Sequence, residues 1–402
     1  MAANEPRQFH PSYGYSKDIF SSPGYYRAMS SRRSVLATGV GIFSSGIAGC
    51  VSVPWFREPD GADWSASVPE PGAFASPVTT DGVVAAGGSR DGGLETGQLV
   101  AFDTETGQQQ WEHEFGRPTG LVAADGTVYV GEKRDSGRSR IAAFDARTGT
   151  QRWQQTVSNH SSAMAVANGT LYAANGGLAA LETADGSVRW EQPHVPETDF
   201  TVIAAPGDQL AADDHAVYFG DADGVVAISP TDGTTSWSWR PAQWETTATA
   251  VAPVPIDDTI FVGGGGDVVA LDAADGSDRW RTPFGRGAEI MGFHATDSSL
   301  LVAESTDAAP SDTFGTVYEL SAEDGSERYE MRFDAPVTRA VSTTATFVVG
   351  TADGTVTWTD GASFFARPET ALPTGGFGLG AAGEQAFAQT SEGTLWALSP
   401  PE

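Results

Sequence analysis

The side chains that could carry catalysis are present, but they do not form a recognised catalytic pattern. Aspartates are plentiful, as in Asp221-Ala222-Asp223-Gly224, yet the spacing of a calcium-binding EF-hand loop is absent. There is no G-x-S-x-G nucleophile motif and no phosphate-binding loop. The six histidines are scattered singly, without the pairing of a zinc site, and we interpret each as a surface or loop residue: His10, His113, His160, His194, His215 and His294. We therefore expect a protein without catalytic activity and keep an enzyme as the alternative.

A second set of residues, near the N-terminus, indicates an export signal and the attachment of a lipid. Arg32 and Arg33 precede a short apolar run, which is the pattern of a twin-arginine (Tat) signal. The run ends at Cys50, the only cysteine, and Ile47-Ala48-Gly49-Cys50 resembles a lipobox, in which the cysteine thiol receives a lipid. An ordinary cleaved signal with an incidental cysteine is the alternative. We expect residues 1–49 to be an N-terminal extension and signal peptide, with Cys50 anchored to the outer face of the cell membrane. We also expect translation to start at Met29, because export signals usually place their arginines close to the initiator.

Two N-x-S/T sequons, at Asn159 and Asn168, are candidate N-glycosylation sites if the chain is exported. Chance occurrence is the alternative, because two sequons are unremarkable in a chain of 402 residues.

Basic residues gather between positions 90 and 140, although the chain has only 23 lysines and arginines against 52 acids. Such a patch could bind an anionic partner, because a guanidinium pairs in a bidentate way with carboxylate or phosphate. Neutralisation by nearby acids such as Glu132 is the alternative. The candidate partner-binding residues are Arg90, Arg117, Lys133, Arg134, Arg138 and Arg140.

The elements that must position these residues are copies of one unit. VVALDAADGSDRW (Val268 to Trp280) returns as LVAFDTETGQQQW, IAAFDARTGTQRW, LAALETADGSVRW, VVAISPTDGTTSW and VYELSAEDGSERY. The turn glycines are 42, 37, 47, 43 and 49 residues apart: Gly107, Gly149, Gly186, Gly233, Gly276 and Gly325. A period of this length indicates one supersecondary unit repeated in space.

Each copy predicts a buried strand, a glycine turn and a return strand. An upstream hairpin, such as DGTVYVGE (Asp125 to Glu132), brings the total to four strands per unit. The aromatic residue always falls four positions after the turn glycine, which predicts a fixed docking contact with the neighbouring unit. The expected docking aromatics are Trp111, Trp153, Trp190, Trp237, Trp280 and Tyr329.

From about Trp55 to the C-terminus, the chain resembles the pyrroloquinoline quinone (PQQ)-type β-propeller repeat family. The family motif A-x-D-x-x-T-G-x-x-x-W matches AFDTETGQQQW and AFDARTGTQRW. The resemblance implies a β-propeller. It also implies an alternative function, because enzymes of this class hold PQQ with calcium through acidic and amide side chains. The adjacent-cysteine disulfide of some members is impossible with one cysteine.

The repeat predicts an all-β, eight-bladed β-propeller of four-stranded blades. Six units carry the turn glycines, and Asp360-Gly361 marks a degenerate seventh. The eighth is a composite: Asp60-Gly61 with Trp64 copies the turn-and-aromatic half of the motif, and Thr394 to Leu398 copies its apolar half. The N-terminal strand would then complete the last blade and close the ring. Residues 50–71 would form the linker and closing-strand region, and residues 72–402 the propeller.

The net charge of −29, with only two lysines, favours a protein from a halophilic archaeon, since hydrated carboxylates keep proteins soluble in high salt. An acidic extracellular protein from another source is the alternative. Such charge argues against nucleic acid as a partner.

We expect a monomeric, cofactor-free, lipid-anchored propeller that binds another protein or a surface polymer. It resembles the bacterial propeller lipoproteins that help assemble outer-membrane proteins, although an archaeon has no such membrane. The alternative is a PQQ- and calcium-dependent quinoprotein dehydrogenase. A convergent set of carboxylates and amides in the central funnel would favour that alternative.

Overall fold

The chain divides into two compact units, Met1–Val53 and Pro54–Glu402. The computed structural model describes residues 59–68, 76–89, 97–133, 139–157, 163–174, 177–192, 210–221, 224–241, 253–264, 266–284, 288–296, 298–307, 313–343, 346–359, 369–373 and 377–400. All of them belong to the second unit. Arg32, Arg33 and Cys50 lie outside the described residues.

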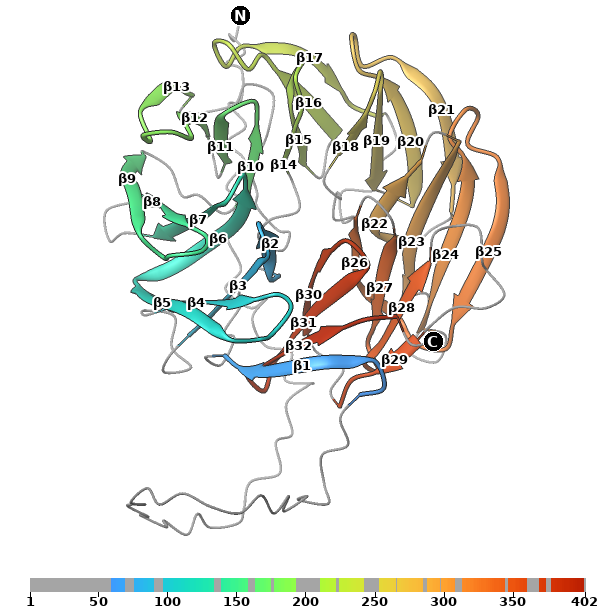
Figure 1. The fold of residues 1–402 in the computed structure, drawn as a ribbon. Helices are drawn as coiled ribbons and strands as arrows, with labels where there is room; N and C mark the ends of the chain where they lie inside the picture. Colours follow the sequence, from blue (N-terminus) through green and yellow to red (C-terminus); the bar gives the residue numbers. More distant parts are fainter. Residues whose placement is uncertain are drawn as a thin grey trace, which may run out of the picture. The chain divides into compact units, whose positions relative to one another are not determined.

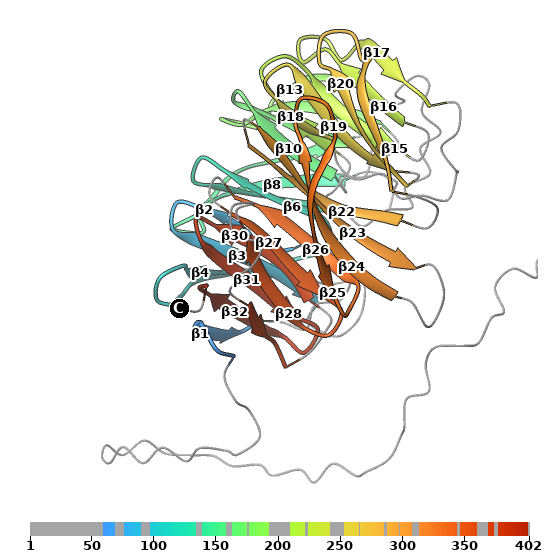
Figure 2. The same cartoon turned by 90° about the vertical axis from the view of Figure 1, so that its right-hand side faces the viewer.

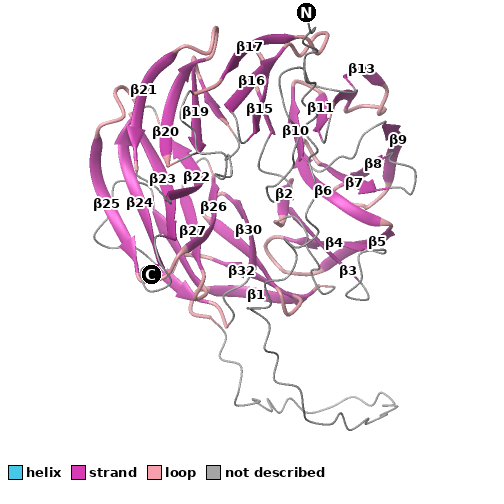
Figure 3. Ribbon diagram, turned by 180° about the vertical axis from the view of Figure 1, so that it is seen from behind, coloured by secondary structure: helices cyan, strands magenta, loops and turns pink. Residues whose placement is uncertain are grey.

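The described residues form eight four-stranded antiparallel sheets arranged as the blades of a β-propeller (Figure 1). Figure 3 shows strands and loops but no helix in the described part of the chain. The described residues therefore contain no helix that is long and apolar enough to cross a membrane. The prediction of an all-β, eight-bladed propeller is confirmed.

The strands of the first four blades, in chain order, have the following bounds. Blade 1 contains β2 (Val78–Thr80), β3 (Val83–Ser89), β4 (Gly97–Asp103) and β5 (Gln109–Phe115). Blade 2 contains β6 (Arg117–Ala124), β7 (Thr127–Lys133), β8 (Ser139–Asp145) and β9 (Gln151–Val157). Blade 3 contains β10 (Ala163–Ala167), β11 (Thr170–Ala174), β12 (Leu178–Glu182) and β13 (Val188–Gln192). Blade 4 contains β14 (Leu210–Ala212), β15 (Val217–Asp221), β16 (Gly224–Ile228) and β17 (Thr235–Trp239).

The second half of the ring repeats this plan, and its last blade takes its fourth strand from the start of the described chain. Blade 5 contains β18 (Val254–Ile256), β19 (Thr259–Gly264), β20 (Asp267–Asp272) and β21 (Asp278–Pro283). Blade 6 contains β22 (Ala288–Ala295), β23 (Ser299–Asp307), β24 (Thr313–Ser321) and β25 (Glu327–Phe333). Blade 7 contains β26 (Val337–Ser342), β27 (Phe347–Thr351), β28 (Thr355–Thr359) and β29 (Glu369–Ala371). Blade 8 contains β30 (Phe377–Ala382), β31 (Gln385–Thr390), β32 (Thr394–Leu398) and β1 (Ala62–Ser67).

The first strand of each blade lies at the centre of the ring. Most neighbouring first strands contact each other, as β2 does with β6 and β30, and β19 contacts β22 where blade 5 meets blade 6. The apolar core is divided among these blade interfaces: one cluster joins Val83 and Trp111 of blade 1 to Val128 and Phe144 of blade 2.

Connections of different kinds lie on the two faces of the ring. We call one the turn face; it carries the tight turns between first and second strands, such as Asp81-Gly82, and between third and fourth strands, such as 104–108. The other, the loop face, carries the hairpins between second and third strands and the connections between blades. Figure 2 shows the blades from the side, with β22, β23 and β24 reaching far out at one end. β23 and β24 have 9 residues each, more than any other described strand.

The ring closes through β1. This strand pairs antiparallel with β32, from Ala62 opposite Leu398 to Ser67 opposite Thr394. Beyond its two ends, the Ser399 N–H donates to the carbonyl of Gly61 and the Val68 N–H to that of Gly393, each at 2.9 Å. The predicted closure by the N-terminal strand is confirmed.

Tryptophans join neighbouring blades through one recurring contact. The indole N–H of Trp111 donates to the carbonyl of Ala146 in the next blade at 2.6 Å, and its ring lies on Gly149. A Cβ on Gly149 would lie 2.5 Å from that ring, and the glycine φ is 67°, so the turn requires glycine for two reasons. The same donation links Trp64 to Thr104, Trp153 to Thr183, Trp190 to Pro230, Trp237 to Ala273 and Trp280 to Ala322.

Tyr329 departs from this arrangement. It occupies the same repeat position in β25, but 54% of its surface is exposed, whereas Trp153 is 7% exposed. The corresponding turn of blade 7, at Asp360-Gly361, lies outside the described residues.

We predict that Trp153→Ala lowers the free energy of unfolding by about 3–5 kcal/mol, because it removes a buried aromatic and leaves the carbonyl of Thr183 without its donor. Chemical denaturation would measure the change. Tyr329→Ala is the matched control and should cost much less; equal losses would contradict the assigned docking role.

Candidate functional site

The central strands decide whether the ring can hold a quinone with calcium. In the described strands β2, β6, β10, β14, β18, β22, β26 and β30, Glu289 is the only carboxylate, and there is no asparagine or glutamine. The rest are mostly valine, alanine, threonine and glycine. Calcium needs six to eight oxygen ligands, several of them carboxylates. The described central strands therefore do not fit a PQQ–calcium site.

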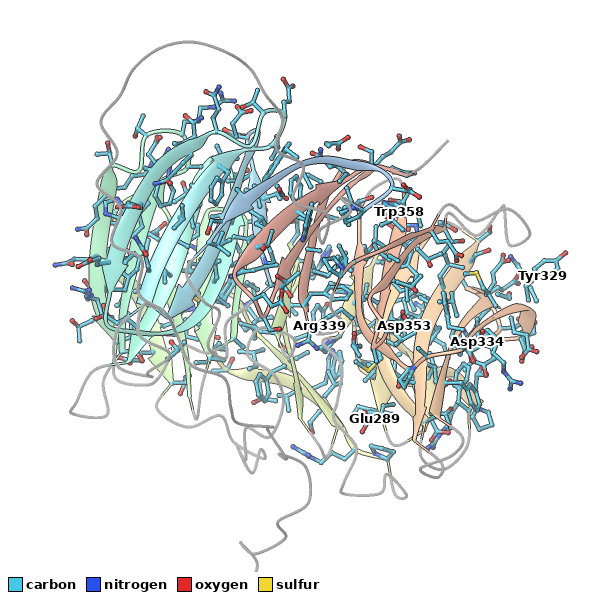
Figure 4. The ribbon with its side chains drawn as sticks, turned by 90° about the horizontal axis from the view of Figure 1, so that it is seen from below. Glu289, Tyr329, Asp334, Arg339, Asp353 and Trp358 are labelled. Atoms are coloured by element: carbon cyan, nitrogen blue, oxygen red, sulfur yellow. The ribbon has the colours of Figure 1, made fainter. Side chains whose placement is uncertain are left out.

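The two charged side chains described on these strands lie on neighbouring blades. Figure 4 labels Glu289, from β22, and Arg339, from β26. Glu289 is exposed, whereas Arg339 is half-buried and donates from Nη1 to the carbonyl of Thr338 at 2.8 Å. Across the described residues, histidine, cysteine and acidic side chains do not form a group of three or more that could hold a metal ion.

A buried carboxylate in blade 2 lies against a cation. Glu132, on β7, is 3% exposed and lies opposite Arg140 of β8 in the strand register. Arg140 Nη2 forms an ion pair with Glu132 Oε2, and the Gly116 N–H donates to Oε1 at 2.9 Å. This arrangement places a cation and a backbone donor beside a buried charge, and both favour the ionised form there.

The corresponding carboxylate in blade 6 lacks that cation. Glu304, on β23, is 2% exposed, and its register partner on β24 is Thr316. The Thr306 hydroxyl donates to Glu304 Oε1. Within the described part of the chain, Glu304 Oε2 and Thr316 Oγ1 are buried without a hydrogen-bond partner.

The environment of Glu304 favours its neutral form. Burial raises the pKa of the Glu304 carboxyl, and the Thr306 hydroxyl and the charge of Arg332 only partly oppose this shift. Arg332 lies across the sheet on β25, with its guanidinium 4.4 Å from the centre of the Phe314 ring. Sequence reasoning missed this carboxyl; the only sign of it was an acid at the end of the apolar run LLVAE.

The interpretation of every histidine as a surface or loop residue is wrong for His294. His294 is not a surface residue: it is 5% exposed on β22, where Nδ1 lies 2.7 Å from Ser342 Oγ of blade 7. Its ring also stacks on Phe347 of blade 7, so the packing of β22 against the neighbouring blade buries this histidine. His113, on β5, is half-buried with Nε2 2.6 Å from the Gly149 carbonyl, while His215 is exposed. The other three lie outside the described residues.

The candidate cationic patch is described only in part. Arg90, Arg134 and Arg138 lie outside the described residues, and only the backbone of Arg117 and Lys133 is described. The backbones of Arg117 and Lys133 lie opposite each other on β6 and β7. Arg140 is paired with Glu132 and also donates to Gln154 Oε1 at 3.4 Å, so local acids and amides already use this guanidinium.

Of the two sequons, only Asn168 is described. It lies in the turn between β10 and β11 with φ 47°, and its Nδ2 donates to Asp214 Oδ1 at 2.6 Å. Thr170, the third residue of this sequon, is 1% exposed. Asn159 lies outside the described residues.

Comparison with known protein families gives a match over most of the propeller. Residues 59–138 and 137–308 match the family described as outer membrane protein assembly factor BamB. The chain belongs to this family. The BamB family match starts where the described residues start and covers blades 1 to 5 and part of blade 6.

Individual relatives agree with the family and with the fold. BamB of Yersinia pestis is 26% identical over 338 residues, which cover 75% of this chain and 80% of the relative. The crystal structure of BamB from Moraxella catarrhalis matches with a TM-score of 0.62 and 18% identity, covering 84% of this chain and 99% of that one. The quinohemoprotein alcohol dehydrogenase ADHIIG of Pseudomonas putida HK5 matches with a TM-score of 0.58 and 15% identity, covering 85% and 76%. The propeller fold is thus shared with proteins of both expected classes.

We predict that Glu304→Gln stabilises the protein above neutral pH by about 1 kcal/mol or more, because the amide can donate to Thr316 without placing a charge in the interface. The folded-state pKa of Glu304 is raised, so its unfavourable effect appears as pH rises from the unfolded value of 4.5 through the folded value. The variant and wild type should therefore converge at acidic pH. Thermal unfolding between pH 4 and 8 would measure this.

Glu132→Gln is the matched control. It removes the ion pair with Arg140 and should destabilise the protein by about 1–3 kcal/mol. If both glutamine variants behaved alike, the two carboxyls would not differ as described.

Proposed function

We propose that this BamB-family propeller is an extracytoplasmic scaffold that binds another protein and is not an enzyme. The observation that carries the proposal is the composition of the central strands, where the described residues supply one carboxylate and no amide. The family match adds support, because its description is that of an assembly factor for other proteins. A surface polymer is the alternative ligand.

We further propose export through the Tat signal at Arg32 and Arg33 and a lipid on Cys50 that holds the protein at the outer face of the cell membrane. The sequence pattern supports this proposal, since the only cysteine of the chain follows the apolar run directly. The acidic composition supports a halophilic source and disfavours nucleic acid as the partner.

The second candidate function is a quinoprotein dehydrogenase. The likeness to the quinohemoprotein alcohol dehydrogenase of Pseudomonas putida favours it, but at 15% identity that likeness concerns the fold. A quinoprotein would need oxygen and amide ligands that the described central strands lack.

We predict that Cys50→Ser releases the protein from the membrane fraction into the soluble fraction, because the lipid would be its anchor. Fractionation followed by immunodetection would measure the distribution. The melting temperature of the propeller should not change, because its first described strand, β1, starts only at Ala62. Persistence of the variant in the membrane fraction would contradict the lipid anchor.

We predict that titration with PQQ and calcium gives no saturable binding, measured by quenching of tryptophan fluorescence and by calorimetry. Saturable binding at micromolar concentrations would instead favour the dehydrogenase. Protein partners would be sought by affinity purification of the anchored protein in high salt, with Cys50→Ser protein as the control.

A further inference from the structure

The direction of the closing strand fixes where the chain enters the propeller. β31 starts at the turn containing Glu384 on the turn face and ends at the hairpin containing Glu392 on the loop face. β32 therefore runs back and ends on the turn face at Leu398. β1 is antiparallel to β32, and Ala62 lies opposite Leu398. The chain thus enters the ring on the turn face.

The entry point is held by several hydrogen bonds to neighbouring residues of the turn face. The Asp63 carboxylate accepts from the side chains of Gln385 and Ser399, each through Oδ2 at 2.7 Å. The Gly61 carbonyl accepts from the Ser399 N–H at 2.9 Å, and the Asp60 carbonyl accepts from the Thr370 hydroxyl. From Asp60 onward, the backbone is therefore fixed to blades 7 and 8.

The distance from the proposed anchor to this point is short. Asp60 lies ten residue steps after Cys50, and ten steps span at most about 35 Å even in a fully extended chain. β31 alone is about 20 Å long, and the nine-residue strands of blade 6 are about 30 Å long. If the loop face lay against the bilayer, nearly the whole length of the tether would be needed to pass along the blades. The short tether therefore favours an orientation in which the turn face is the face nearer to the membrane.

The charge of the turn face opposes insertion into lipid. Its described turns expose many acids, and Arg147 and His215 are the only basic residues in those turns. Carboxylates such as Asp185 and Asp232 have a lowered pKa because turn N–H and hydroxyl groups donate to them, so they stay ionised. The exposed acids of these turns are Asp81, Glu105, Asp125, Asp185, Asp214, Asp232, Asp257, Asp258, Asp275, Glu323, Asp324 and Glu384.

We propose that the turn face is the membrane-proximal surface of this protein, held near the lipid headgroups without entering them, and that the loop face points away from the membrane. This inference rests on the proposed lipid on Cys50. It assigns the lipid surface to the face that carries the described acidic turns. The loop face, which carries the hairpins between second and third strands and the connections between blades, is then free to bind the partner. It includes the end of the long β23–β24 hairpin of blade 6.

The test compares two glutamates at opposite ends of one strand. Glu384 and Glu392 are both exposed, flank β31, and lie in the blade that contains β1. Lipidated Glu384→Cys and Glu392→Cys proteins, purified from membranes, are each labelled with a donor dye; the acylated Cys50 thiol does not react. Each is reconstituted into vesicles with an acceptor dye on the lipid headgroups. Energy transfer should be stronger in the Glu384→Cys protein, corresponding to a donor about 20 Å closer to the bilayer.

The outcomes separate the two proposals. Equal transfer, or stronger transfer in the Glu392→Cys protein, with both proteins floating with the vesicles, would overturn the orientation and leave the anchor intact. Failure of both proteins to float with the vesicles would overturn the anchor, and the orientation with it. The same variants carrying Cys50→Ser give the background transfer of unanchored protein.

Discussion

The contact on which the ring depends is the approach of a tryptophan to a glycine turn in the next blade. Each contact combines a close approach that only glycine allows with an indole N–H donated to a turn carbonyl, as between Trp111 and Ala146. Trp64 makes the same contact with Gly107 and Thr104, so the last blade meets the first as each of blades 1 to 5 meets the next. Since no described residue can form a disulfide, this repeated packing and the pairing of β1 with β32 hold the ring closed.

Among the six blades that carry the repeated turn glycine, blade 6 departs from the others in three respects. Its docking position holds the half-exposed Tyr329, and its second strand holds Glu304 without the arginine that pairs Glu132 in blade 2. Its second and third strands are also the longest described. A blade that relies less on the common contacts can tolerate such changes, because the remaining interfaces and the closed ring still hold it in place.

The sequence predicted the features that repeat. The number of blades, the closure by β1 and the docking tryptophans all follow from spacing, because a contact made many times leaves the same residues at the same intervals. It did not predict features that occur once. His294 looked like any isolated histidine, and its burial arises from the packing of β22 against blade 7, where it contacts Ser342 and Phe347. Glu132 and Glu304 each end an apolar run, and only the strand register shows that one faces an arginine and the other a threonine.

The composition of the central strands also explains how one fold can serve unrelated functions. Most neighbouring first strands contact each other, and small side chains such as those of Ala212, Ala340 and Gly378 permit that approach. A ring that holds a cofactor must place ligand oxygens at some of these positions, where this chain uses alanine, valine and glycine for packing. Among the described residues, most charged side chains lie outside the central strands, and many exposed acids lie in the turns of the turn face. A propeller built this way offers its two faces, rather than a ligand set on the described central strands, for interactions with other molecules.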